Sequence, residues 1–491
     1  MKSYQFFFLI IFLLPLIAAA KQEIKFDDYF TDKTMRIDYF HIGSAKEELI
    51  TIDKIYSYGI WAGSLSNLVD ELNNGKYYVK IYDSASGKLI YSKGFDTYFG
   101  EYKSSDAGLN GINKAYHETA IIPQPKNKIR FALEQRDDKN ELKEFYTTEI
   151  DPADIMIVRE KIADNSVKVF ESLKSGDPHV KVDIAILSEG YTAEEESKFE
   201  ADLKRFTDIF FKLEPYASLK DKFNFYGVFK PSAETGTDEP RANIYRKTVL
   251  NTTFNSLGSE RYLLTEDNKA IRDLAAHVPY DALYIMVNHS RYGGGGIYNW
   301  SCTYTADNQW ADYLFHHEFG HSFSGLADEY YTSDVAYNGM FTQKVEPVEP
   351  NITALHDPQN IKWKKFVEAG MEIPAGWKKD EFDKMDFKWQ EERRALNNRI
   401  AELKKNNASK EEIAAAENEY NEKDRAHSMK VHEFLNSQPI AGKVGAFEGA
   451  GYSPKGLYRP EVDCIMFTKA SMKFCKVCEE AIKRVIKTYT E

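Results

Sequence analysis

The chain has 491 residues and a formal net charge of −12 at pH 7, from 76 acidic and 64 basic side chains. This acidic balance disfavours nucleic acid or an anionic membrane surface as a partner. The length is sufficient for two or three domains.

Residues 1–20 are typical of a signal peptide for export. Lys2 supplies the positive end, residues 6–17 form an apolar core, and residues 18–20 are alanines suited to cleavage. The apolar run is short for a membrane span, and no later stretch is long and apolar enough to be one. No cysteine follows the alanines, which disfavours a lipid anchor. We therefore predict a secreted or periplasmic protein without a membrane span.

Residues 21–150 are predicted to form an antiparallel β-sandwich domain, because short alternating segments are separated by polar turns. Two hairpins are expected, residues 77–82 with 88–91 and residues 128–134 with 142–146. His41 and His117 are isolated in this region, and we expect both to be structural.

Residues 151–179 are interpreted as a partly helical connector, and residues 180–491 as the second domain. Buried-type strands are predicted at residues 182–187, 223–229 and 282–287. A capping box at Thr192–Glu195 starts a helix that is expected to run to about Leu213. Strand, helix, strand order implies parallel strands with a helix on one face, so the whole chain is predicted to be α+β.

Four glycines, Gly293–Gly296, precede a predicted strand at residues 297–304. A strand rather than a helix follows, so this run is not expected to bind phosphate. We expect a mobile loop beside a cleft, followed either by a sheet edge that pairs with an extended substrate or by an ordinary edge strand.

The most specific pattern in the chain is His317-Glu318-Phe319-Gly320-His321. Residues four apart lie on one face of a helix, so both imidazoles can bind one metal ion. Glu318 is placed to take a proton from metal-bound water. Asp307 or Asn308 could cap this helix, and Gly325 could end it. We favour a zinc site over a buried, hydrogen-bonded histidine pair.

A hydrolytic zinc site needs a third protein ligand and one open position. The long zincin pattern has a glycine three residues after the second histidine and its third ligand three residues later. Here Gly325 comes one residue late, and Asp328 follows three residues after it. We predict Asp328 as the third zinc ligand, with Glu329 as the alternative. The carboxylate that does not bind zinc is expected to orient a ligand histidine.

A polar, loop-rich region follows Tyr331, and a highly charged helical segment begins near Lys378. Helical patterns lie on both sides of Asn406-Asn407, and Ser409–Glu412 is a second capping box. We predict a helical hairpin inserted at residues 378–435. Charged hairpins are usually solvated spacers and otherwise act as gates or partner surfaces.

All the cysteines of the chain, Cys302, Cys464, Cys475 and Cys478, lie in the second domain. In an exported chain a disulfide is expected, first between Cys464 and either Cys475 or Cys478. A four-thiolate zinc site is disfavoured because the other two cysteines lack paired spacing. A redox role for Cys475 and Cys478 is weaker still, since no thioredoxin-like pattern accompanies them.

The motifs His317–His321, Gly325–Tyr330, Asp463–Met466 and Phe474–Cys478 resemble those of the IgA peptidase family of secreted bacterial metallopeptidases. The resemblance covers roughly residue 180 to the C-terminus, and a β-rich N-terminal domain is also typical of that family. It implies zinc on His317 and His321 and a catalytic Glu318. Asp463–Met466 resembles the tight turn of metzincins, whose methionine lies beneath the metal, so Met466 is expected to have this packing role.

The site implies a secreted zinc-dependent endopeptidase that acts on a protein or peptide substrate, with IgA or another host protein as one candidate. Glu318 is expected to take a proton from the attacking water and to return it to the leaving amine. Tyr458, Tyr330 and Arg459 are candidate donors to the developing oxyanion.

Two other functions are considered. The aromatic-rich N-terminal region and the charged hairpin would suit a non-catalytic surface or adhesion protein on a zincin scaffold. The intact Glu318 argues against it, because a binder has no need of that side chain. A zinc amidase acting on cell-wall peptides would share the chemistry and differ in the shape of the cleft.

Overall fold

The structure is a computed structural model that describes residues 24–159, 162–333, 341 and 343–491. The predicted signal peptide, residues 1–20, lies outside the described residues. Among the residues that the structure describes, no helix combines the length and the apolarity needed to cross a membrane.

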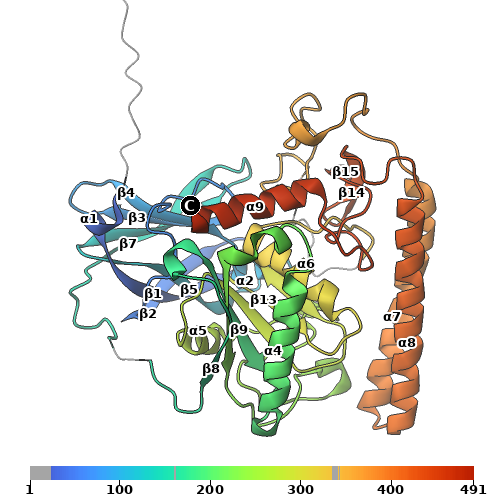
Figure 1. Cartoon of the computed structure of the whole chain (residues 1–491), viewed down its shortest axis with the longest axis horizontal. Coiled ribbons are helices and arrows are strands. Elements are labelled where there is room, and N and C mark those ends of the chain that lie inside the picture. The colour runs from blue at the N-terminus through green and yellow to red at the C-terminus, as the bar shows by residue number, and fades with distance from the viewer. Residues whose placement is uncertain (1–23, 160–161, 334–340, 342) are drawn as a thin grey trace, which may run out of the picture.

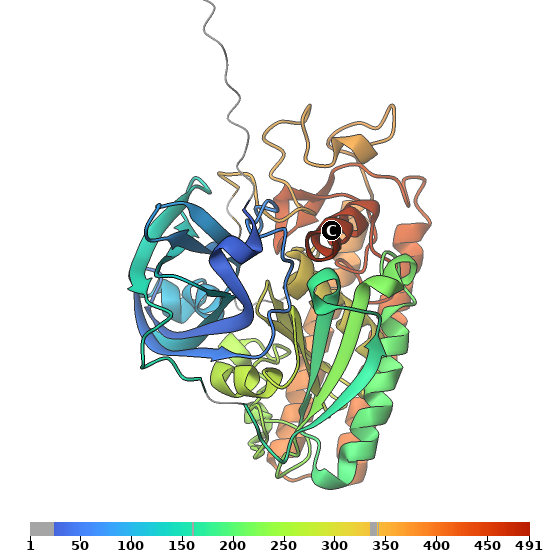
Figure 2. The same cartoon turned by 60° about the vertical axis from the view of Figure 1, so that its left-hand side comes forward.

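The N-terminal region contains two antiparallel sheets that share one apolar core. The first has the order β2-β1-β5 and the second β4-β3-β6-β7. Figure 2 shows them beside each other, in blue and teal. Their strands are β1 (Phe30–Gly43), β2 (Glu48–Tyr58), β3 (Tyr77–Asp83), β4 (Leu89–Phe95), β5 (Lys114–Pro125), β6 (Ile129–Arg136) and β7 (Leu142–Ile150). The short helices are α1 (Phe26–Tyr29), α2 (Tyr98–Lys103) and α3 (Asp106–Leu109). Both predicted hairpins are confirmed, since β3 pairs with β4 and β6 with β7.

His41 lies in the interior of this region, between two carboxylates. Its Nδ1 is 3.0 Å from Glu118 Oε2 and its Nε2 is 3.0 Å from Glu48 Oε2. Burial alone would lower the pKa of His41, but the charges and hydrogen bonds of Glu118 and Glu48 raise it above its usual value. These contacts give His41 a structural role.

Replacing His41 by glutamine is expected to destabilise the protein more at pH 6 than at pH 9. A raised pKa in the folded state means that the charged imidazole adds stability below its unfolded-state pKa of about 6.5. That contribution is lost as the pH rises through the folded-state value. Denaturant unfolding of wild type and variant at both pH values measures the difference. An equal cost at pH 6 and pH 9 would contradict the charged pairing.

The second region is built on a mixed sheet with the order β12-β13-β11-β9-β10-β8. Its strands are β8 (Lys168–Lys174), β9 (Val182–Glu189), β10 (Phe223–Phe229), β11 (Ala282–Val287), β12 (Gly294–Ile297) and β13 (Ser301–Thr305). The predicted parallel pairing is confirmed, because β9 pairs in parallel with both β10 and β11. Residues 151–179 are less helical than predicted, since β8 lies within them and pairs antiparallel with β10.

Helices cover both faces of this sheet. Alternate residues of β9 point to opposite faces: Ile184 and Ile186 pack in the core with α4, α6 and α9, whereas Ala185 and Leu187 pack with α5. The helices are α4 (Glu196–Phe210), α5 (Asn268–Ala275), α6 (Ala311–Ser324) and α9 (Lys476–Thr490). The capping box that was predicted at Thr192 and Glu195 is present just before α4. The antiparallel N-terminal sheets and the mixed sheet confirm an α+β fold.

The glycine run is a strand rather than the predicted mobile loop. Gly294–Ile297 forms β12, which pairs antiparallel with β13 at the edge of the sheet. The segment 297–304, predicted as one strand, is divided, and β13 lies inside the sheet between β12 and β11. The absence of a side chain at Gly296 lets α6 approach, since a Cβ there would meet the Glu318 carbonyl oxygen at 2.4 Å.

Two long antiparallel helices, α7 (Lys379–Lys405) and α8 (Lys410–Asn436), form the predicted hairpin (Figure 1). The predicted capping box at Ser409 and Glu412 begins α8. One face of the hairpin is anchored, because Arg393 Nη1 lies 2.6 Å from Glu260 Oε1 and Trp310 Nε1 donates to Asp424 at 2.7 Å. Charged residues at the anchored face therefore make specific contacts rather than only solvating a spacer.

The remaining strands are β14 (Phe447–Ala450) and β15 (Ser453–Arg459), a short antiparallel pair near the end of the chain. Short 3-10 helices occur at Pro178–Val180, Ala193–Glu195, Ala217–Lys222, Pro240–Ala242, Ser256–Gly258 and Lys364–Phe366.

Candidate metal centre

Helix α6 carries the central residues of the predicted site. It ends at Gly325, whose φ of 63° is left-handed and whose N–H donates to the carbonyls of Gly320 and His321. At the other end, the N-cap residue is Trp310, which makes no side-chain cap, so the predicted cap by Asp307 or Asn308 is wrong. Asn308 instead accepts a hydrogen bond from the Trp310 N–H at 2.9 Å, in the turn before the helix. The chain then turns back along the helix, which brings Asp328 to the histidines.

His317, His321 and Asp328 converge on one point. The Nε2 atoms of the two histidines are 3.1 Å apart. Asp328 Oδ1 lies 3.0 Å from His317 Nε2 and 3.2 Å from His321 Nε2. Ligand atoms at the corners of a tetrahedron with metal bonds of about 2.0–2.1 Å lie roughly 3.3 Å apart. The observed spacing therefore fits a zinc-sized ion.

Main-chain carbonyls fix the orientation of both rings. His317 Nδ1 is 3.0 Å from the Ile465 carbonyl, and His321 Nδ1 is 2.6 Å from the Leu326 carbonyl. A carbonyl only accepts, so each Nδ1 carries the proton and donates it. The lone pairs of both Nε2 atoms thus face each other and the Asp328 carboxylate. Three such electron-pair donors repel one another unless a cation lies among them, and this donor set is one that zinc prefers.

The Asp328 carboxylate favours positive charge at the histidines, which is a proton on His321 when no metal is bound and a metal ion when one replaces that proton. Burial alone would lower the pKa of His321, but the Asp328 carboxylate raises it to about 9. Burial alone would raise the pKa of Asp328, but His321 and His317 hold it well below its usual value.

Glu329, the alternative third ligand, points away from the histidines. Its Oε1 accepts a hydrogen bond from Asn351 at 3.0 Å and lies 3.3 Å from Cys478 Sγ. The prediction that it orients a ligand histidine is wrong, because main-chain carbonyls already accept from the Nδ1 atoms of both histidines. Of the two candidate third ligands, Asp328 is therefore the one that lies against both histidines, as the spacing after Gly325 predicts.

Tyr452 and Arg261 support the site and were not found from the sequence. The Tyr452 hydroxyl donates to Asp328 Oδ2, which leaves Oδ1 toward the histidines. Arg261 Nη2 donates to the Tyr330 hydroxyl at 2.9 Å, and the Tyr330 ring is stacked 6.2 Å from the His317 ring. Tyr452 is 124 residues from its partner, and no local pattern marks such a pair.

Glu318 borders the same cleft as the three converging side chains. Burial raises its pKa, and the charges of His317 and His321 oppose this effect. A Cβ on Gly294 would lie 2.9 Å from Glu318 Oε1, so the edge strand β12 passes directly beside this carboxylate.

The cleft has an open volume of about 860 Å³, including space open to solvent. Tyr330, one of the predicted oxyanion donors, lines it together with Arg261 and Tyr292. The other two predicted donors are elsewhere. Tyr458 and Arg459 lie on β15, and the Arg459 guanidinium is buried against main-chain carbonyls.

Met466 lies in a tight turn beneath α6. The Phe467 and Thr468 N–H groups both donate to the Cys464 carbonyl, which closes the turn. A Cβ on Gly320 would meet Met466 Sδ at 2.9 Å, so the methionine packs directly against the helix that carries the histidines. Met466 therefore packs against this helix, whereas its predicted position beneath a bound metal stays a prediction.

Two imidazoles and a carboxylate that converge beside a second carboxylate, in a cleft at a sheet edge, are typical of metal-dependent hydrolases. Comparison with family models narrows this class. The model of the IgA peptidase M64 family matches residues 170–486, and the model described as the Peptidase M64 N-terminus matches residues 25–147. The chain belongs to the IgA peptidase M64 family, which implies a peptidase with a protein substrate. A search of curated proteins found no match.

Proposed function

We propose that the protein is an exported zinc-dependent endopeptidase, with His317, His321 and Asp328 as metal ligands and Glu318 as general base. The observation that carries the proposal is the convergence of both Nε2 atoms and Asp328 Oδ1 within 3.0–3.2 Å of one another. A zinc ion bound there would lower the pKa of a bound water to about 7 and polarise a substrate carbonyl.

The protein's own groups then have separate tasks. The Glu318 carboxylate takes the proton of the attacking water and delivers it to the leaving amine. Arg261 and Tyr330, joined by a hydrogen bond at the cleft wall, are our candidate donors to the developing oxyanion. The position of Met466 under α6 supports a metzincin-like arrangement of the catalytic domain.

The edge strand β12 is the feature that favours an endopeptidase. It borders the cleft and passes beside Glu318, so an extended peptide could pair with its main chain without regard to sequence. The Gly294 carbonyl already accepts from the Leu263 N–H at 3.1 Å and the Ile297 carbonyl from the Trp300 N–H at 3.0 Å, which leaves the partly exposed Gly296 between them for pairing with a substrate. The family description supplies IgA as one candidate substrate to test.

Chelation tests the proposed function. Purified protein is expected to cleave casein. This activity should fall at least about 100-fold with 1,10-phenanthroline and recover when zinc is added. IgA and cell-wall stem peptides are assayed in parallel, because their cleavage separates a host-directed peptidase from an amidase. Cleavage that is insensitive to chelator, or a zinc-loaded protein inactive on all substrates, would overturn the proposal.

A further inference from the structure

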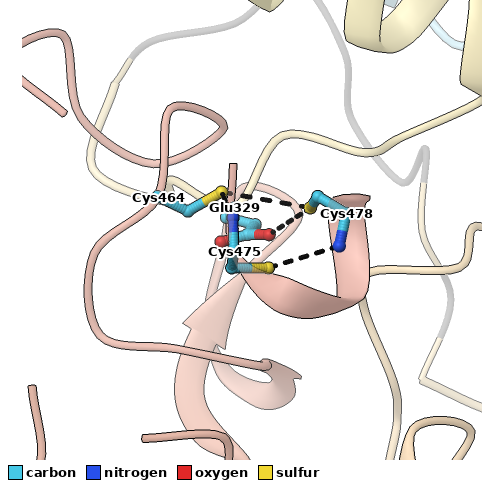
Figure 3. A group of neighbouring side chains, drawn as sticks. All are labelled: Glu329, Cys464, Cys475 and Cys478. Carbon is cyan, nitrogen blue, oxygen red and sulfur yellow. Dashed lines mark hydrogen bonds between the residues drawn. The ribbon is translucent and has the colours of Figure 1, made fainter. Parts of the chain in front are cut away.

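A second group of possible metal ligands lies outside the cleft, and the proposed function does not use it. Cys464, Cys475, Cys478 and Glu329 each offer one ligand atom, and these atoms all lie within 4.8 Å of one another. All four residues are at most 1% exposed. Figure 3 shows that their side chains face one another from three separate segments, which are the loop after α6, the Met466 turn and the start of α9.

Two of the three clustered sulfur atoms, those of Cys464 and Cys475, already receive main-chain hydrogen bonds. The Cys475 N–H donates to Cys464 Sγ at 3.3 Å, and the Cys478 N–H donates to Cys475 Sγ at 3.4 Å. The Met466 N–H also points at Cys464 Sγ, at 3.5 Å. Cys475 is the N-cap residue of α9, where the helix dipole favours negative charge. These donors stabilise thiolates, which are the form of cysteine that binds metal.

The Glu329 carboxylate supplies an independent indication of a ligand. Oε2 is buried and has no hydrogen-bond partner among the described residues. A buried carboxylate oxygen without a partner costs stability unless a cation or donor meets it. Oε1 lies 3.3 Å from Cys478 Sγ, so the carboxylate is directed at the cysteines.

We propose that Cys464, Cys475, Cys478 and Glu329 bind a second divalent ion, and that this ion is zinc. Three thiolates and one carboxylate are a donor set that suits tetrahedral zinc. Sulfur atoms in a zinc tetrahedron with bonds of about 2.3 Å lie roughly 3.8 Å apart. The Sγ atoms of Cys464 and Cys478 are 3.9 Å apart.

The role of this ion is structural. Protein atoms fill all four positions, so none is open to water or substrate, as is typical of structural zinc. Binding releases the thiol protons to solvent and leaves excess negative charge. The Arg459 guanidinium interacts electrostatically with Glu329 and Cys464 and offsets part of this charge. Its Nη1 donates to the Gly449 carbonyl at 2.7 Å, so it is fixed in place.

The second ion would hold together the segments that shape the candidate metal centre. Glu329 directly follows Asp328, and its N–H donates to the Met466 carbonyl at 2.8 Å. Cys464 and Met466 flank Ile465, whose carbonyl accepts from His317 Nδ1 at 3.0 Å. One ion thus anchors both the segment of the third ligand and the segment that orients the first.

A disulfide is the competing use of these cysteines. In the structure all four cysteines are free thiols, so the predicted disulfide with Cys464 is not formed. A disulfide would use two of the three clustered sulfurs and leave Glu329 facing one thiol. Metal content and thiol state therefore separate the two possibilities.

The experiment uses the full chain with the first site disabled by His317→Ala and His321→Ala. Wild type is expected to hold about two zinc ions per chain, and this double variant about one, by elemental analysis. X-ray absorption at the zinc edge of the double variant should show sulfur neighbours at about 2.3 Å. Adding Cys475→Ser and Cys478→Ser should remove the remaining zinc, whereas adding Cys302→Ala should retain it. Cys302 is the matched control, because its buried thiol faces the Leu283 carbonyl outside the cluster.

Glu329→Gln, added to the His317→Ala and His321→Ala variant, tests the site if the variant with Cys475→Ser and Cys478→Ser does not fold. It is expected to lower zinc affinity about tenfold or more and to remove the oxygen neighbour from the absorption spectrum. A double variant without zinc, or mass spectrometry that shows two of the three cysteines joined, would overturn the second site. A wild type that holds one zinc ion, lost with the histidines, and that cleaves casein would leave the proposed function intact.

Discussion

Glu318→Gln is expected to lower kcat/KM for peptide cleavage by about 10²–10⁴-fold while the zinc content stays at the wild-type value. Glutamine has the shape of glutamate but cannot accept the proton of the attacking water. The histidines and Asp328 contact each other directly, so their geometry does not require the Glu318 charge. The loss should therefore appear mainly in kcat.

Asp312→Asn is the matched control for this variant, because Asp312 lies in the first turn of the same helix and outside the residues that line the cleft. It should keep activity close to wild type. Elemental analysis and steady-state kinetics on a fluorogenic peptide measure both outcomes. Wild-type activity in Glu318→Gln would remove Glu318 from the role of base.

Asp328→Asn is expected to weaken zinc binding at the cleft by more than the 10–100-fold that is typical of losing an outer partner. The amide of asparagine is a poorer zinc ligand than a carboxylate, and the substitution removes the negative charge that faces both imidazoles. Activity measured against buffered free zinc should shift to higher zinc and recover only in part.

Tyr452→Phe provides a graded comparison, since it keeps the ring and removes the hydroxyl that donates to Asp328 Oδ2. Its zinc affinity should fall by about 10–100-fold, with kcat recovered at saturating zinc. Tyr331→Phe is the control, because the Tyr331 hydroxyl donates to a different carboxylate, Asp383, at 2.6 Å. Equal zinc affinity in Asp328→Asn and wild type would exclude Asp328 as a ligand.

Local patterns in the sequence predicted the features that depend on short separations. Helical spacing placed His317 and His321 on one face, and the capping boxes at Thr192 and Ser409 marked where helices begin. The turn after Gly325 favoured Asp328 over Glu329. Each prediction depends on residues within a few positions of each other, where backbone geometry alone determines the neighbours.

The sequence did not predict features that arise from distant contacts. Gly294–Gly296 forms a strand because it pairs with β13 and packs closely against α6, whereas composition alone indicated a loop. The environment of Glu329 comes from cysteines more than 130 residues away. Arg459 was expected at the cleft, but it packs 3.8 Å from the centroid of the Phe467 ring instead.

The wall of the cleft also includes two acidic residues of the N-terminal region, Asp96 directly after β4 and Glu101 in α2. Glu101 accepts a hydrogen bond from the Tyr262 hydroxyl at 3.0 Å, and Asp96 donates its N–H to the Tyr298 carbonyl at 2.9 Å. Under the proposed function, the N-terminal region would therefore contribute to substrate preference, whereas the proposed catalytic residues all lie in the second region. Exchanging the N-terminal region between relatives is then expected to redirect the protease to new targets without disturbing its chemistry.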